Sequence, residues 1–156
     1  DLVLVEKFSD SSLKRKLFNR LLEDSNDHAY DDWQEYTIDI LRVCAEVADT
    51  EALRVLLRAR VMAYLDKSET DGFSTYYAAP LLQILHRLIV LYGTDAEALQ
   101  FEEENSTHAS FREMLIERAK KENNFEKVIK LAMDGEKQDD YYAGRKPKWK
   151  EIRYDA

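Results

Sequence analysis

The amino-acid sequence predicts an all-α fold made of antiparallel helix hairpins. Its 156 residues contain only four glycines and two prolines, so helix-breaking positions are rare. Apolar residues recur every three or four positions along most of the chain, which is the period of an amphipathic helix. No segment shows the alternation and glycine-containing turn of a β-hairpin. With 45% apolar residues, the chain can bury a substantial core and is not expected to be disordered.

Four helices are expected in the first part of the chain, and their apolar stripes indicate which side faces the core. Pro80 either lies in the first turn of a helix that starts near 79 or kinks a longer one that starts near 75. The segment 66–72 is predicted to be a polar loop. The expected helices are 11–23, 31–48, 50–66 and 75 or 79 to 92. Their expected inward residues include Leu13, Phe18, Trp33, Tyr36, Ile40, Cys44, Leu53, Leu56, Leu57, Val61, Leu81, Leu85, Leu88 and Tyr92.

Four shorter helices are expected in the rest of the chain. Thr94 and Asp95 begin one that ends in the acidic run 102–106, which we expect to be an exposed helix end. Thr107 or Ser110 caps the next, and Ser110-x-x-Glu113 matches a capping box. Asn123 and Asn124 form a tight turn into a helix over 124–134, with Phe125, Val128 and Ala132 facing inward and Gly135 as its C-terminal stop. Pro147 then opens a last helix.

The charge of the chain is unevenly distributed. Residues 1–104 hold 21 acidic and 11 basic side chains, a net charge of −10, whereas residues 105–156 hold 10 acidic and 12 basic ones, a net charge of +2. An acidic body argues against nonspecific binding to nucleic acid, which depends on neutralising phosphates. No apolar run is long enough to span a membrane. The single cysteine, Cys44, predicts a reducing compartment, and we expect a cytoplasmic protein.

The ends of the sequence predict an excerpt of a longer polypeptide. The last helix is barely two turns long when the chain stops, and short helices depend on neighbours for their stability. The sequence also lacks an initiator methionine. We expect residues 1–156 to form one helical-repeat domain within that longer chain.

A resemblance to a known repeat is visible around the turn at Asn123–Asn124. The segment from Leu115 to Ala132 looks like the junction of a tetratricopeptide-type hairpin, with a helix, a two-residue turn, an aromatic residue and a branched apolar pair. Arg112 and Ile116 stand where that family has a tryptophan and a glycine. The resemblance covers about one repeat, and it implies a short α-solenoid of tetratricopeptide or HEAT-like type.

The C-terminal third is also similar to helical regions that accompany SWIM-type zinc fingers in bacterial proteins. That motif's zinc-binding cysteines and histidine are not in this sequence. The resemblance implies a bacterial source and places any nucleic-acid contact outside this segment.

Local motifs for catalysis, metal or cofactor binding are absent from the sequence. No glycines are spaced for a phosphate-binding loop, and no His-Glu-x-x-His or Gly-x-Ser-x-Gly pattern occurs. His28, His86 and His108 are widely separated, and we interpret them as surface or packing residues. Cys44 is interpreted as a small buried hydrophobic residue. We expect no catalytic residues, no metal and no cofactor.

Two groups of residues are candidates for partner binding. The first combines aromatic and basic side chains, which suit an acidic peptide or a nucleic-acid strand; the alternative is that its tryptophan packs on the preceding hairpin. Its members are Tyr141, Tyr142, Arg145, Lys146, Lys148 and Trp149. The second group is Arg54 and Arg58, which share a helix face and could hold carboxylates of a partner. Their alternative role is to neutralise acidic neighbours.

The sequence therefore favours a non-enzymatic protein–protein interaction scaffold. A stack of helix hairpins offers a groove to a protein or peptide partner. The alternative is a helical nucleic-acid-binding module that uses the cluster at 141–150, although nucleic-acid binding by this segment alone is not expected. An enzyme whose site assembles between helices is the third possibility, and it would need at least two of the three histidines and Cys44 to meet in a polar pocket.

Overall fold

A computed structural model describes residues 11–25, 34–70, 77–138 and 145–156. These residues form eight α-helices and contain no strand, which confirms the all-α fold class. The chain divides into an N-terminal unit, residues 1–92, and a C-terminal unit, residues 93–156. Each unit is a set of helices that pack on their neighbours in sequence. The expected solenoid and the expected single domain over 1–156 stay predictions.

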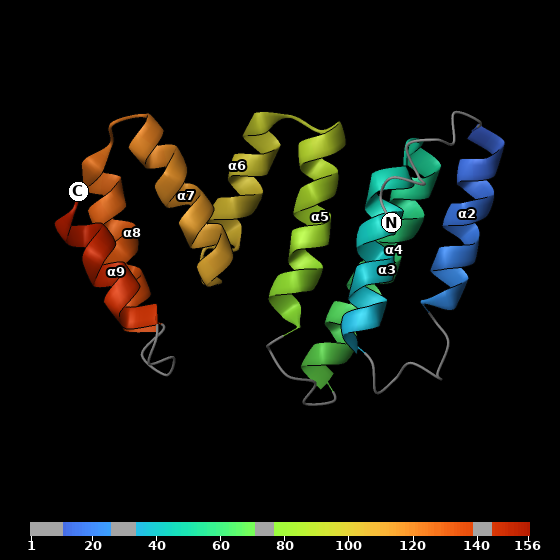
Figure 1. Ribbon diagram of the computed structural model, residues 1–156, viewed down its shortest axis with the longest axis horizontal. Coiled ribbons are helices and arrows are strands. Elements are labelled where there is room, and N and C mark those ends of the chain that lie inside the picture. Colours follow the sequence, from blue (N-terminus) through green and yellow to red (C-terminus); the bar gives the residue numbers. More distant parts are fainter. Residues whose placement is uncertain (1–10, 26–33, 71–76, 139–144) are drawn as a thin grey trace. The chain divides into compact units, whose positions relative to one another are not determined.

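The N-terminal unit contains the helices α2 (Ser11–Asp24), α3 (Gln34–Val47), α4 (Glu51–Thr70) and α5 (Ala78–Tyr92). Among these elements, α2 packs on α3 and α4 packs on α5, and α3 also contacts both α4 and α5 (Figure 1). The buried core follows the apolar positions of all four helices. It consists of Phe18, Ile38, Ile40, Leu41, Cys44, Ala45, Val47, Ala48, Leu53, Leu57, Val61, Leu81, Ile84 and Leu88.

The C-terminal unit contains α6 (Asp95–Glu104), α7 (Ala109–Lys121), α8 (Phe125–Gln138) and α9 (Arg145–Tyr154). The closest packing in this unit is between α8 and α9, which lie side by side in Figure 1, and between α7 and α8. Ala109, Ile116, Ala119, Val128 and Trp149 form its main buried cluster. The rings of Phe101 on α6 and Phe111 on α7 meet edge to face, with centroids 5.7 Å apart.

Local sequence signals explain how the helices of the C-terminal unit begin and turn. Thr94 caps α6 in a full capping box, because its hydroxyl accepts from the Glu97 amide at 3.2 Å and the Glu97 carboxylate accepts from the Thr94 amide at 2.7 Å. Asn123 has a φ of 56°, a left-handed conformation that asparagine tolerates, and this makes the predicted tight turn between α7 and α8. The Asn124 side chain then accepts from the Lys127 amide at 3.1 Å.

Two expectations about helix ends were wrong, and for Pro80 one of the two alternatives was confirmed. The third helix continues to Thr70, so most of the predicted loop 66–72 is helical. Ser110 is not a cap, because His108 holds the N-cap position of α7 and the buried Ser110 hydroxyl finds no hydrogen-bond partner among the described residues. Pro80 lies in the first turn of α5, which starts at Ala78, and proline is tolerated in a first turn.

The sequence predicted that Gly135 ends α8. That prediction was wrong, because Gly135 lies inside the helix. The reason is packing rather than capping. A Cβ atom built at Gly135 would be 2.6 Å from Cδ2 of Trp149, so glycine is present because the indole of α9 occupies the space of a side chain. A glycine near a helix end has two physical uses, and the sequence pattern does not distinguish them.

Candidate binding surface

Helix α4 carries apolar side chains on two opposite sides. Leu53, Leu57 and Val61 are at most 4% exposed and belong to the core of the N-terminal unit. A second row, which we call the α4 outer face, is open to solvent, with Val55 at 52%, Leu56 at 48% and Met62 at 48% exposure. Three exposed alanines complete that row. The α4 outer face therefore consists of Ala52, Val55, Leu56, Ala59, Met62 and Ala63.

The spacing of these residues shows why they form a single surface. They follow one another at intervals of three, one, three, three and one, so they return to the same side of a helix with about 3.6 residues per turn. The core residues of α4 lie roughly half a turn away. The sequence-based assignment of Leu56 to the inward stripe was wrong, because packing within the unit uses only one of the two apolar sides. The i, i+3, i+4 pattern of the outer row was present in the sequence and was missed.

Arg54 and Arg58, which the sequence marked as candidates, both bind a single acidic neighbour on their own helix. Arg54 Nε lies 3.0 Å from Glu51 Oε2, and Arg58 Nη1 lies 3.1 Å from Glu51 Oε1. The hydrogen bond from Arg54 is the largest cause that lowers the pKa of Glu51, followed by the bond from Arg58. The Arg54 guanidinium also lies over the ring of Tyr92, 4.4 Å from its centroid. The alternative role of the two arginines, neutralising an acidic neighbour, is what the structure shows.

Arg58 and Arg60 border the α4 outer face along its two edges. The Arg58 side chain remains 45% exposed despite its bond to Glu51. On the other edge, Arg60 reaches the carbonyl oxygen of Leu22 at 3.4 Å and the Ser25 hydroxyl at 3.5 Å, both neutral groups at the end of α2. Arg58 and Arg54 share the single carboxylate of Glu51, so these three side chains together keep a net charge of +1, and Arg60 adds a positive charge on the other edge.

A shallow hollow of about 320 Å³ lies between α3 and α5. Arg87 of α5 binds Glu46 of α3 through both oxygens, at 2.7 and 3.0 Å, and this hydrogen bonding raises the pKa of Arg87. Arg42 binds Asp39 at 2.8 Å on the same helix. The charged side chains that line the hollow are therefore engaged in ion pairs within the unit.

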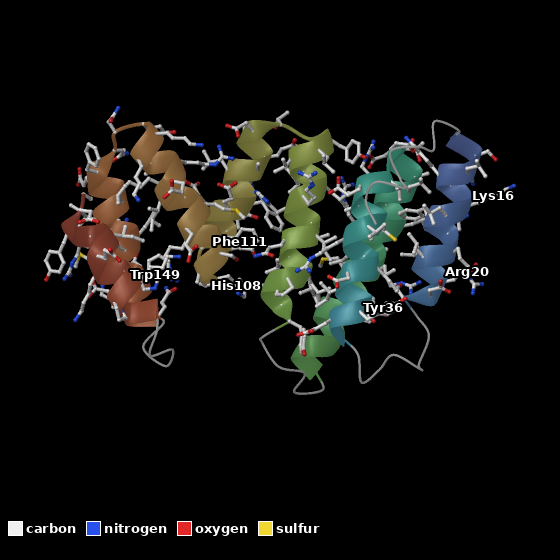
Figure 2. The ribbon with its side chains drawn as sticks, viewed as in Figure 1. Lys16, Arg20, Tyr36, His108, Phe111 and Trp149 are labelled. Atoms are coloured by element: carbon white, nitrogen blue, oxygen red, sulfur yellow. The ribbon has the colours of Figure 1, made fainter. Side chains whose placement is uncertain are left out.

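Trp149, the tryptophan of the aromatic and basic candidate group, packs inside the C-terminal unit and is fully buried (Figure 2). Its ring lies against Gly135, and the guanidinium of buried Arg112 is 5.2 Å from its centroid. Lys148 Nζ lies 2.7 Å from a carboxylate oxygen of Glu113 on α7. The interpretation that the tryptophan packs on the preceding hairpin is therefore confirmed.

The remaining aromatic and basic candidates lie at the start of α9 or outside the described residues. Arg145 and Lys146 begin α9, and Tyr141 and Tyr142 lie outside the described residues. Their proposed contact with a partner stays a prediction.

Arg112 occupies a position where the tetratricopeptide resemblance expects tryptophan, and it is only 1% exposed. It donates to the carbonyl oxygen of Thr107 at 3.1 Å and to the side-chain oxygen of Gln138. Together with the contact to Trp149, these bonds make Arg112 a structural link between α7, α8 and α9. Burial of an arginine requires such partners, and the sequence alone did not reveal them.

Glu102 belongs to the acidic run that the sequence placed at an exposed helix end, and that expectation was wrong for this residue. Its side chain is 3% exposed and accepts two hydrogen bonds from Arg118 of α7, at 2.6 and 3.1 Å. Arg118 also reaches Asp95 at 2.7 Å. The bonds to Glu102 are the main cause that raises the pKa of Arg118.

The histidines and Cys44 were candidates only for an assembled site. Cys44 is fully buried in the N-terminal unit, and burial raises the pKa of its thiol to about 12 despite an opposing effect from Arg60. His86 is buried in α5. His108 lies beside Phe111 in the C-terminal unit (Figure 2), and its pKa is lowered first by burial and then by the Arg112 charge. His28 lies outside the described residues.

Within the residues that the structure describes, no group of three or more histidine, cysteine, aspartate or glutamate side chains is placed to hold a metal ion. In the same part of the chain, every helix is too short or too polar to cross a membrane.

Comparison with known proteins gives no family for this chain. No protein-family model matches it, and neither a curated protein nor a solved structure is significantly similar to it.

Proposed function

We propose that this protein is a non-enzymatic protein–protein interaction scaffold that binds its partner through the α4 outer face. The observation that carries the proposal is the exposed row of Val55, Leu56 and Met62 with its three alanines on a helix that is anchored by its opposite side. Contiguous exposed apolar patches on a folded protein mark interaction surfaces, whereas scattered single residues do not. The α4 outer face is contiguous over three helical turns.

The proposal also fits the architecture of stacked helix hairpins. In such stacks each hairpin buries one stripe on its neighbours and leaves another side for a partner. In the C-terminal unit, α8 likewise exposes Phe125 at 46% and Met133 at 40% of their surface. Phe125 was expected to face inward, and that expectation was wrong. Other helices also expose large apolar side chains, such as Tyr36 on α3 and Val90 on α5, but α4 carries three of them in one row with exposed alanines.

The burial of Trp149 weakens the alternative of nucleic-acid binding. A base stacks on an aromatic ring only when a ring face is accessible, and Trp149 is fully buried. Lys148 is paired with Glu113, which reduces the charge it offers to a phosphate. These contacts favour a protein partner.

Site-specific photocrosslinking tests the proposed function. A benzophenone amino acid replaces Met62 in the full chain, expressed in the cells that produce the protein, and a matched copy carries it at exposed Leu13 on α2. A protein adduct is expected from position 62 and not from position 13, and the pair Val55→Glu and Leu56→Glu should remove it. Equal adducts at both positions, or none at position 62, would overturn the proposal.

A further inference from the structure

We infer that the partner element bound by the α4 outer face is an amphipathic α-helix whose apolar stripe is bordered by carboxylates. This inference rests on the proposed function and adds the chemistry of the partner. It is drawn from three properties of α4: the shape of the exposed row, the charges along its edges and the distribution of small residues within it.

The shape of the α4 outer face suits a helix. The row from Ala52 to Ala63 extends about 16 Å along α4, at about 1.5 Å per residue. Alanines at 52, 59 and 63 leave low points between the larger side chains of Val55, Leu56 and Met62. Side chains of a partner helix can enter such low points as ridges enter grooves. The backbone amides in the middle of α4 are used within the helix, so a β-strand would find no edge to pair with.

The charges around the row specify an acidic partner. Between residues 51 and 65 the charged side chains are Glu51, Arg54, Arg58 and Arg60, a net charge of +2, because Glu51 is shared by Arg54 and Arg58. Arg58 stands on one edge with its side chain 45% exposed, and Arg60 stands on the other, bonded to neutral oxygens. Carboxylates on both sides of an incoming stripe would meet these guanidinium groups in charge-assisted hydrogen bonds.

The same charges argue against a second copy of this chain as the occupant. If two α4 outer faces packed on each other in either direction about their middle, the arginines of one copy would lie among those of the other. Such like-charge contacts are unfavourable.

A membrane surface fits less well than a helix. Helices that lie on membranes insert large apolar residues such as tryptophan, phenylalanine and leucine. Half of the α4 outer face is alanine, and none of its six residues is aromatic. Small residues favour close contact between two helices over insertion among lipid chains.

The test uses two stapled helical peptides of about 18 residues, or five turns, with the same leucine and alanine stripe. One carries glutamate along both edges of the stripe and the other carries lysine. Fluorescence anisotropy with the full chain should show at least about tenfold tighter binding of the glutamate peptide, and less preference at about 0.5 M salt. Val55→Glu with Leu56→Glu should abolish this binding. The control Leu13→Glu, at another exposed leucine, should leave it unchanged.

A charge exchange makes the test specific. Arg58→Glu should weaken the glutamate peptide and strengthen the lysine peptide, while circular dichroism shows that the variant keeps its helix content. Equal binding of both peptides, binding of neither, preferential binding to phosphatidylserine vesicles or a dimer in sedimentation would each overturn the inference. An adduct from position 62 together with failure of both peptides would reject the acidic helix while leaving the scaffold function intact.

Discussion

The indole of Trp149 on α9 lies directly against Gly135 on α8, so closely that a methyl group at 135 would be 2.6 Å from the ring. This contact joins the two helices with the most extensive packing in the C-terminal unit. It also explains why a glycine, a poor helix former, occurs inside α8.

Gly135→Ala should destabilise the full chain by about 1–2 kcal/mol, because overpacking against a buried ring outweighs the gain in helix propensity of about 1 kcal/mol. Urea denaturation followed by circular dichroism measures the change. Lys130→Ala, at an exposed position of the same helix, should change stability by less than about 0.5 kcal/mol. A smaller ring should relieve the clash, so Gly135→Ala should cost less in a Trp149→Phe background than alone. Additive effects would contradict this account.

Leu56 and Leu57 are adjacent on α4, but Leu57 lies on its buried side and Leu56 on its exposed side. Leu57→Ala removes a fully buried side chain and should lower the free energy of unfolding by about 2–5 kcal/mol. Leu56→Ala removes one that is 48% exposed and should change it by less than about 0.5 kcal/mol. Chemical denaturation of the two variants provides the comparison. Similar losses for both would mean that the outer face is covered within the protein itself.

Removal of Arg118 should leave the buried Glu102 carboxylate without its main partner. We expect Arg118→Ala to cost about 2–3 kcal/mol, below the about 3–5 kcal/mol of a fully buried pair because Arg118 is itself 28% exposed. Lys127→Ala is the control, since it breaks the more exposed pair with Glu103 at 3.0 Å and should cost less than about 0.5 kcal/mol. Thermal melts of the two variants would contradict the prediction if their midpoints coincided.

The Cys44 thiol should be inert in the folded protein. Its pKa is raised from 9.0 to about 12 by burial, and only the thiolate reacts with disulfide reagents. At pH 8 a thiol reagent should modify the native chain far more slowly than the chain in urea, and Cys44→Ala should abolish the reaction. Since the folded pKa lies above the unfolded one, this thiol's stabilising contribution is complete below pH 9.0 and is lost as the pH rises toward about 12. Equal rates for native and unfolded chains would refute the burial of Cys44.

The sequence predicted the helices well but the direction of their side chains less well. The periodic apolar residues and the turn at Asn123 indicated where helices begin and end, because those signals are local. Several residues matched the inward pattern and are nonetheless 39–48% exposed, namely Leu13, Tyr36, Leu56, Tyr92 and Phe125. An apolar period shows that a side could be buried, whereas burial itself needs a neighbouring helix on that side.

The candidate surface was the part least accessible to sequence reasoning. Trp149 was a binding candidate because it is an aromatic residue among lysines. Its ring instead packs against Gly135 and Arg112. Arg54 and Arg58 were recognised as a pair, although their shared partner Glu51 was not. The exposed row of α4 was overlooked because its apolar residues alternate with those of the core side.

By itself, the sequence determined an all-helical chain with rare breakers and a buried, unreactive cysteine. Helix formation depends on local hydrogen bonds and on the period of apolar residues, and both involve residues that are close together in the sequence. Only the tertiary structure decided that α4 keeps one apolar side in solvent, that Gly135 leaves room for the Trp149 indole and that Glu102 binds Arg118. Those outcomes depend on which helices meet, and residues far apart in sequence establish that through packing.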